Sequence, residues 1–410
     1  MSKLDELIAE LCPDGVEYTT IENVCTKISS GGTPNTSRSD YYGGDIAWLR
    51  TQEVDWVDIL DTGIKITEEG LNNSSAKWIP KNCVIVAMYG ATAAKVAINK
   101  IPLTTNQACC NLQVDKNKAL YRYVYYWLAN NYNELKALGQ GSQSNINAKI
   151  IRSFPIPLPP LPVQQEIVHI LDNFTELTAE LTAELTARRK QYEYYLNCLF
   201  TFSNRPDVKY MSVGELFEFK NGLNKGKEYF GTGTPIVNFT DVFNNRYLTS
   251  DKLKGRVTVS NKEIELYSAR KGDVFFTRTS ETRDEIGMAS VLVEDVESCV
   301  FSGFVLRARP KTALLLPKYC SYCFSSYNLR KEIIKSSSYT TRALTSGTKL
   351  SKLFIPVPPL EEQERIVAIL DRFDALCNDL TSGIPAEIEA RQKQYEYYRD
   401  KLLSFKEVTA

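Results

Sequence analysis

The sequence predicts an α+β protein in which two similar mixed α/β domains are joined by two long antiparallel, coiled-coil-like helices as a pseudo-twofold internal repeat. The first observation is a duplicated stretch: Ile156–Phe174 (IPLPPLPVQQEIVHILDNF) recurs as Ile355–Phe373 (IPVPPLEEQERIVAILDRF). The second is the hexapeptide KQYEYY, which begins at Lys190 and again at Lys393. A repeat of this length does not arise from biased composition, so the chain consists of two tandem halves.

The repeat divides the chain into four predicted segments. At 410 residues the chain is longer than one hydrophobic core usually organises. The segments are an N-terminal arm with the first domain, a proline hinge with a central spacer helix, the second domain, and a second hinge with C-terminal spacer helices: 1–155, 156–204, 205–354 and 355–410. Residues 13–24 loosely resemble 205–216, as in a circularly permuted repeat. We therefore expect the N-terminus to lie near the C-terminal helix.

Both domains show the same order of predicted elements. Residues 16–118 alternate short apolar runs with turn sequences such as SSGGTPNTS, which is typical of strands and turns. Tyr121–Leu138 places apolar residues at helical spacing, and Pro317–Lys335 is the matching helix of the second half. A polar loop follows each helix and leads to the hinge. The two domains are thus predicted to share one fold with diverged surfaces.

A long helix is predicted after each hinge. The hinge prolines require an extended backbone until Pro162, which can occupy an early helical position. Apolar residues then recur at steps of three, four and seven, a seam that is most simply covered when the two helices pack antiparallel. The second copy has four extra residues, including Ser382–Gly383 and Pro385, so we expect a break and a new helix from Pro385. The predicted spacer residues are Leu177, Leu181, Leu185, Tyr192, Tyr195, Ile388, Tyr395 and Tyr398.

Charge is unevenly distributed although the net charge is zero. Residues 206–354 contain 23 basic and 16 acidic side chains, whereas residues 355–410 contain 7 basic and 11 acidic ones. A basic domain held by acidic helices is typical of a nucleic-acid-binding protein. Solvated helix faces are often acidic for other reasons, so the basic domain is the more informative half of this pattern.

No catalytic, metal or membrane site is predicted. Cys320-x-x-Cys323 would need two further zinc ligands, so two buried thiols on a helix is the preferred interpretation, and the ten cysteines are expected to be reduced. Gly222–Lys227 has the wrong spacing for a phosphate loop. The only histidine, His169, has Ala368 as its counterpart in the repeat. No apolar run of about 18 residues and no signal peptide are present, which predicts a cytoplasmic protein without a membrane partner.

The two hinges and the paired KQYEYY ends resemble the specificity subunit of type I restriction–modification enzymes. The TAEL tetrads at 178–181 and 182–185 resemble the spacer of the type IC subfamily. This resemblance implies that the domains are target-recognition domains, each reading one half of a bipartite, asymmetric site in double-stranded DNA. It also implies that the helices set the spacing and dock two methyltransferase (M) subunits, with two restriction (R) subunits added. The chain itself would be non-catalytic, and S-adenosylmethionine, ATP and Mg²⁺ would belong to the partner subunits.

The polar loops before the hinges are the main candidates for DNA contact. Phosphates are bound by Lys, Arg and small hydroxyls, and base edges by Arg, Asn, Gln, Ser or Thr. The predicted DNA-binding residues are Thr33, Asn35, Ser37, Arg38, Gln143, Ser144, Asn145, Asn147, Arg278, Arg283, Thr341, Arg342 and Lys349. Ordinary surface loops are the alternative interpretation of each group.

Two other classes of function are alternatives to DNA recognition. One is a coiled-coil scaffold that carries two globular modules, and the other is an enzyme with an unrecognised site between the domains. Internal duplication argues against the enzyme, and the basic charge of residues 206–354 favours DNA recognition over the scaffold.

Overall fold

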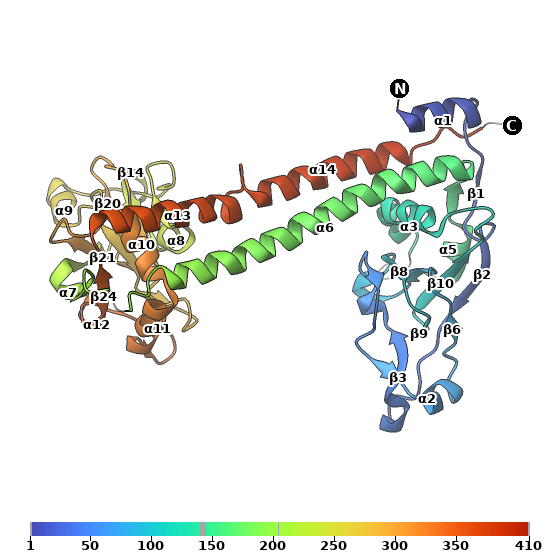
Figure 1. Cartoon of the computed structure of the whole chain (residues 1–410), viewed down its shortest axis with the longest axis horizontal. Coiled ribbons are helices and arrows are strands. Elements are labelled where there is room, and N and C mark those ends of the chain that lie inside the picture. Colours follow the sequence, from blue (N-terminus) through green and yellow to red (C-terminus); the bar gives the residue numbers. More distant parts are fainter. Residues whose placement is uncertain (1, 140–144, 204, 409–410) are drawn as a thin grey trace. The chain divides into compact units, whose positions relative to one another are not determined.

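The computed structural model describes residues 2–139, 145–203 and 205–408 (Figure 1). The chain divides into two compact units. Unit 1 contains Met1–Glu180 and Ile388–Ala410, and unit 2 contains Leu181–Glu387. Both unit boundaries therefore fall inside helices rather than in linkers. Within the described residues, no helix is long and apolar enough to span a bilayer.

Unit 1 is built on a five-stranded sheet and a four-stranded sheet. The five-stranded sheet has the order β2 (Cys25–Ser30), β10 (Cys109–Val114), β7 (Val84–Ala87), β8 (Val96–Asn99) and β4 (Asp58–Ile59). Its first four strands are antiparallel, and the edge strand β4 runs parallel to β8. The four-stranded sheet has the order β5 (Lys65–Ile66), β3 (Tyr42–Leu49), β9 (Leu103–Thr105) and β6 (Trp78–Ile79).

The helices of unit 1 differ from the prediction in two places. Besides its parts of the long helices, unit 1 contains α1 (Lys3–Leu11), α2 (Glu68–Asn72), α3 (Tyr121–Asn130), α4 (Tyr132–Ala137) and α5 (Ala148–Ser153). The single helix predicted over residues 121–138 is divided at Asn131, whose side-chain amide donates to the carbonyl of Trp127 at 2.9 Å. Helix α5 was predicted as loop, and it forms because the side chain of Asn147 caps it by accepting from the Ile150 N–H at 3.0 Å.

Unit 2 repeats the five-stranded sheet with the same strand order and directions. The strands are β13 (Phe217–Asn221), β21 (Val305–Pro310), β17 (Val274–Thr277), β19 (Ala289–Leu292) and β15 (Tyr247–Leu248). Two three-stranded sheets accompany it: β16 (Arg256–Val257), β14 (Phe230–Val237), β20 (Val300–Phe301), and β18 (Thr279–Ser280), β23 (Ala343–Leu344), β22 (Ser338–Tyr339). The shared sheet confirms the prediction of one fold in both domains.

The helices of unit 2 show the same departure from prediction. They are α7 (Val213–Leu216), α8 (Phe239–Asn244), α9 (Asn261–Leu266), α10 (Pro317–Ser325), α11 (Tyr327–Ser336) and α12 (Gly347–Leu350). The predicted helix over residues 317–335 is divided at Ser326, whose hydroxyl donates to the carbonyl of Cys323 at 2.7 Å. A local side-chain bond to the backbone thus ends the first helix in both units.

Each proline hinge forms a short antiparallel strand pair. β1 (Tyr18–Thr20) pairs with β11 (Pro155–Pro157), and β12 (Lys209–Ser212) pairs with β24 (Phe354–Val357). This pairing confirms that the hinges are extended and that residues 13–24 correspond to residues 205–216. The continuous helix α6 (Leu161–Cys198) begins directly after the first hinge, with Pro162 in its first turn.

The second long segment is broken, as predicted. α13 (Leu360–Asn378) and α14 (Ile384–Leu402) are separated at 379–383, so the second helix begins one residue before the predicted Pro385. Asp379 accepts hydrogen bonds from the backbone and hydroxyl of Thr381 at 2.7 and 2.6 Å. A Cβ on Gly383 would lie 2.6 Å from the carbonyl oxygen of Ala375, so this close approach requires glycine.

The long helices pack antiparallel within each unit. In unit 1, the ring of Phe174 stacks on that of Tyr398 with centroids 5.5 Å apart, and Ile167 shares a core with Leu403. In unit 2, the ring of Phe373 stacks on that of Tyr195 at 5.3 Å. The KQYEYY stretch of each half therefore packs on the duplicated helix start of the other half.

The predicted spacer seam is unevenly buried. Tyr192 is buried, as are Leu196 and Phe200, which the predicted seam omitted. Leu181 is half-buried and Leu177 is exposed. Tyr195 and Tyr398, toward the ends of the seam, are exposed, whereas Leu185, Ile388 and Tyr395 are half-buried. Burial therefore does not follow position along the predicted seam.

The N-terminal arm of unit 1 joins the C-terminal segment, as the permuted repeat predicts. The Val16 N–H donates to the carbonyl of Lys406 at 2.8 Å, and the Val408 N–H donates to the carbonyl of Val16 at 3.2 Å. Gly15 has φ +118°, and a Cβ there would lie 2.5 Å from the Lys406 carbonyl oxygen. Leu4 of α1 is buried in the same core as Leu403.

Candidate nucleic-acid interface

One end of each five-stranded sheet gathers most of the predicted DNA-binding residues. Because β2, β10, β7 and β8 are antiparallel, the segments after β2 and β7 and the segment before β10 emerge at the same end. We call the segments 31–38, 88–92, 106–108 and 145–147 the loop end of unit 1. The loop end of unit 2 consists of the corresponding segments 222–227, 278–285, 302–304 and 336–346.

The backbone framework of the loop end in unit 1 centres on Met88. Its N–H donates to the carbonyl of Ala108 at 2.8 Å, and its carbonyl accepts from the Ile146 N–H at 3.0 Å. The side-chain carbonyl of Asn145 accepts from the Gly90 N–H at 3.2 Å. These bonds join three of the four segments.

Unit 2 has the same framework around Arg278. Its N–H donates to the carbonyl of Phe304 at 3.2 Å, and its carbonyl accepts from the Thr345 N–H at 3.1 Å. The side chain of Arg278 also reaches the carbonyl of Gly303 at 3.5 Å. The loop ends thus share backbone geometry while their side chains differ, a methionine in one unit standing where the other has an arginine.

Several of the predicted DNA-binding residues between 33 and 38 already bond to neighbouring residues of the same segment. Thr33 donates its hydroxyl to the side chain of Gln107, so residues 31–38 join the loop end. The side chain of Asn35 accepts from the backbone and hydroxyl of Ser37 at 3.0 and 2.8 Å. Arg38 is paired with Asp40, which lowers the pKa of that carboxyl. Arg38 is therefore a poorer phosphate contact than its charge alone suggests.

The remaining predicted residues of unit 1 lie in the segment before α5. Asn145 is occupied with Gly90, and Asn147 is the cap of α5, so both have structural partners. Gln143 and Ser144 lie outside the described residues.

Most predicted residues of unit 2 meet at the small sheet β18-β23-β22. The guanidinium of Arg283 lies 5.2 Å from the ring centre of Tyr339, and Arg342 approaches Glu281 at 3.9 Å. Thr341 is exposed in the turn between the last two strands. Lys349 lies in helix α12 rather than in this loop group. The loop end of unit 2 therefore presents two arginines and an aromatic ring on one short sheet.

Sequence reasoning missed the aromatic residues of both loop ends. Phe304 and Tyr89 are exposed large aromatic side chains, and Gln107 is exposed beside Thr33. Residue type and spacing alone carry no signal for the exposure of these side chains.

Two buried glutamines of the duplicated motif fasten the long helices to the sheets. Gln164 accepts from the Leu120 N–H at 2.9 Å and donates to the carbonyls of Lys118 and Pro159 at 3.2 and 2.8 Å. Gln363 makes the equivalent three bonds in unit 2. Both side chains are fully buried, so losing one would leave several buried polar groups unpaired.

The duplicated aspartate adds a second anchor in unit 1. The Asp172 carboxylate accepts from the Nε of Arg122 at 2.7 Å and from the hydroxyl of Tyr126 at 2.5 Å. Arg122 also approaches Asp58 of the edge strand β4 at 3.5 Å. Helix α6, helix α3 and the edge strand are thereby connected.

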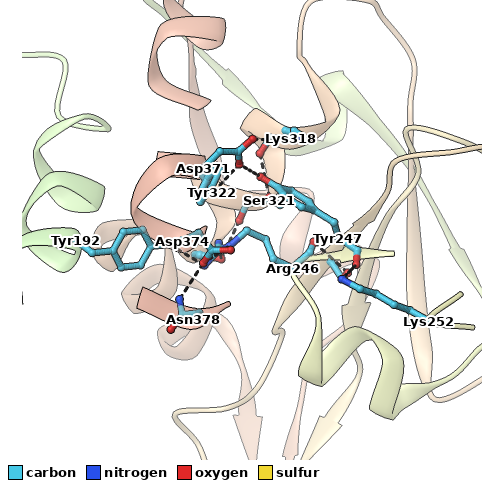
Figure 2. Close-up of polar contacts among 12 residues, drawn as sticks. Tyr192, Arg246, Tyr247, Lys252, Lys318, Ser321, Tyr322, Asp371, Asp374 and Asn378 are labelled. Carbon is cyan, nitrogen blue, oxygen red and sulfur yellow. Dashed lines mark hydrogen bonds and ion pairs between the residues drawn. The ribbon is translucent and has the colours of Figure 1, made fainter. Parts of the chain in front are cut away.

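The corresponding aspartate of unit 2 has a larger set of partners (Figure 2). The Asp371 carboxylate accepts from Lys318, Tyr247 and Tyr322, each at 2.7 Å. The ammonium of Lys318 lies 4.8 Å from the ring centre of Tyr247. These residues come from α13, α10 and the edge strand β15, the same three kinds of element as in unit 1.

Arg246 extends this cluster to helix α6. Its guanidinium donates to the hydroxyl of Tyr192 at 2.8 Å, lies 3.7 Å from Asp374, and covers the ring of Tyr322 at 4.5 Å (Figure 2). The spacer residue Tyr192 is therefore bonded to the residue that directly precedes the edge strand β15 of the five-stranded sheet of unit 2.

The ionisation of Asp371 responds to two opposing effects. Burial raises the pKa of its carboxyl, but the hydrogen bonds from Lys318, Tyr247 and Tyr322 outweigh burial, so the net pKa lies below the ordinary 3.8. A carboxylate with a lowered pKa stabilises the fold above the unfolded pKa. That contribution is lost as pH falls through the folded pKa.

We predict that Asp371→Asn lowers the free energy of unfolding by about 2 kcal/mol at pH 7, because a partly buried ammonium loses its charged acceptor. The difference from wild type should shrink as pH falls below about 4, where this carboxyl begins to protonate in the unfolded chain, and further as pH falls through the lowered folded pKa. Urea unfolding at pH 7 and at pH 3 measures the free energy of unfolding of both proteins. Asp14→Asn, which alters an exposed carboxylate, is the matched control and should leave stability unchanged. An equal loss for Asp371→Asn at pH 7 and pH 3 would contradict the assignment.

The Cys320 and Cys323 thiols lie buried on α10, which confirms the preferred interpretation of that pair. Burial raises the pKa of Cys320 to about 12, so the thiol is protonated at neutral pH. Across the ranges 2–139, 145–203 and 205–408, no group of three or more His, Cys, Asp or Glu side chains is placed to hold a metal. His169 is exposed on α6 and lies 3.3 Å from the side chain of Asn173.

Two sheets of one design, each with its own loop end and each anchored to long helices, define a duplicated recognition protein. The chain belongs to the family of the type I restriction modification DNA specificity domain, whose model matches residues 13–188 and again 206–390. The two matches coincide with the two halves of the repeat.

Individual relatives agree with this family. The chain is 36% identical to the type I restriction enzyme EcoR124I/EcoR124II specificity subunit of Escherichia coli over 71% of this chain and 72% of that protein. It is 32% identical to a putative type I restriction enzyme specificity subunit of Haemophilus influenzae over 71% and 74% of the two chains. A chain from a structural study of complex assembly in the type I R-M system has the same fold, with a TM-score of 0.64, 18% identity and 95% and 97% coverage.

Proposed function

We propose that this chain is the DNA-recognition subunit of a type I restriction–modification complex and that each loop end reads one half of a bipartite, asymmetric site. The observation that carries the proposal is the shared framework of the two loop ends, in which Met88 and Arg278 hold equivalent backbone positions. Identical frameworks with different side chains suit two half-sites of different sequence, because side chains, not the backbone, distinguish base edges.

The chemistry of the two loop ends differs in kind. Unit 1 offers amides and hydroxyls, such as Gln107 and Thr33, which bond to base edges. Unit 2 offers Arg283 and Arg342, which suit phosphates or guanine. This difference agrees with the excess of basic residues in 206–354.

The long helices are proposed to set the gap between half-sites and to dock two M subunits, to which two R subunits are added. Supporting this, the central leucines of the seam remain partly exposed, Leu177 to 36%. The proposed contact residues are the predicted spacer residues except Tyr192, which is buried and bonded to Arg246. S-adenosylmethionine, ATP and Mg²⁺ are assigned to the partner subunits, this chain being non-catalytic, and the complex would work in the cytoplasm, where the DNA is.

The test is methylation mapping. The chain is expressed with the M subunit of its own operon, and the host genome is sequenced for modified adenines. We expect one motif with two short defined halves and a fixed gap. If no such motif appears while the same M subunit is active with another specificity subunit, the chain is a coiled-coil scaffold rather than a DNA reader.

We predict that one extra TAEL tetrad after Leu185 lengthens the gap by about one to two base pairs and leaves both half-sites unchanged. Four helical residues add ~6 Å along α6 and about one turn, so the seam keeps its face. Methylation mapping of the variant measures the gap. The double variant Ala179→Gln and Ala183→Gln keeps the helix length and should keep the parental gap. An unchanged gap after the insertion would exclude the proposal that the length of α6 sets the gap.

A further inference from the structure

Phe304 is the most exposed aromatic side chain of the loop end of unit 2. Its side chain is 67% exposed. Single exposed apolar residues are common, so exposure alone indicates nothing. What distinguishes Phe304 is its backbone and its neighbours.

The turn that carries Phe304 is held rigidly from two sides. The carbonyl of Phe304 accepts from the Arg278 N–H at 3.2 Å, and the preceding Gly303 N–H donates to the carbonyl of Leu223 at 2.8 Å. The Phe304 N–H itself donates to the hydroxyl of Ser302 at 3.3 Å. The ring thus projects from a turn fixed to both neighbouring loops, so little order must be gained when it meets a ligand.

An aromatic hollow lies beside the ring. Phe304 lines a cavity of about 370 Å³ together with Phe239, Phe243 and Arg342, and the acidic residues Glu281 and Glu285 also line it. The rings of Phe239 and Phe243 are stacked, with centroids 5.7 Å apart and an angle of 15° between them. The guanidinium of Arg278 reaches the carbonyl of Gly303, the residue before Phe304, at 3.5 Å. A projecting ring, an aromatic surface and flanking cations are therefore gathered in one place.

We infer that Phe304 is a wedge that inserts between two base pairs of the half-site read by unit 2. Proteins that unstack a base step use apolar side chains of this kind, and cations beside the wedge hold the phosphates of the opened step. Arg278 is in position for that role at the Gly303 carbonyl, whereas Arg342 would have to leave Glu281, which lies 3.9 Å away. The hollow gives the unstacked base an aromatic surface on which to rest. The inference rests on the proposed DNA-recognition function and adds how one half-site is deformed.

Unit 1 lacks this device at the equivalent position. The residue whose carbonyl accepts from the Met88 N–H is Ala108, which has a single methyl group and is 8% exposed. The wedge therefore deforms only the half-site of unit 2, so the two halves of the site differ in shape as well as in sequence.

The test uses the complex of this chain with its M subunits and DNA that carries the mapped site. 2-Aminopurine, which fluoresces more strongly when unstacked, replaces bases one at a time in both half-sites, away from the methylated adenines. We expect wild type to raise fluorescence at one step of the unit 2 half-site. Phe304→Ala should abolish the rise and raise the Kd by about tenfold to a hundredfold, while the slope of affinity against salt stays the same. Phe304→Leu, which is still an apolar wedge, should keep most of the fluorescence rise and most of the affinity.

Phe354→Ala is the matched control, because this phenylalanine is 62% exposed but lies in the hinge strand β24. It should change neither the fluorescence nor the Kd. If Phe304→Ala keeps the rise and the affinity while the complex still methylates its bipartite site, the wedge is wrong and the recognition function stands. If wild type shows no specific DNA binding, the recognition function fails first. Equal melting temperatures of the variants exclude loss of folding as the cause.

Discussion

The buried glutamine of the duplicated hinge is the interaction on which the arrangement of each unit depends. Gln164 and Gln363 each satisfy three backbone groups that no other side chain reaches among the described residues, and both lie where a long helix leaves its sheet. A buried amide with all its partners fixes one orientation more strictly than apolar packing, since rotation would strand several polar groups at once. Within each unit the loop end is therefore held at a defined angle to the helices.

An aspartate eight residues after each glutamine provides a second anchor, which is charged. Asp172 and Asp371 each draw a cation and a tyrosine of the domain helix onto the long helix. The anchors are alike in both halves while the loop ends are not. Constancy at the hinge and variation at the far end of the sheet would allow the proposed reading surface to change without altering how the domain is held. The anchors and the proposed reading surface lie at opposite ends of one sheet.

The repeat made the fold predictable, but single contacts determine where helices break and which side chains are exposed, and the sequence pattern does not show these contacts. Hydrophobic periodicity located the helices over residues 121–138 and 317–335 yet could not show that Asn131 and Ser326 break them by bonding to nearby carbonyls. Residue type also could not show which side chains are free to contact DNA, because Asn147 caps a helix and Arg38 is paired with Asp40. Phe304 escaped prediction because its exposure depends on a turn tied to two loops distant in sequence.

The central claim is that each loop end reads its own half of the site. The most direct measurement is the methylation specificity of a chain altered only in unit 2, by Arg283→Ala with Arg342→Ala, sequenced genome-wide beside wild type. These side chains are exposed, so the fold should be retained. The account predicts that one half-site becomes relaxed or weaker, while the other half and the gap are unchanged. Altered specificity in both halves, or in neither, would contradict it.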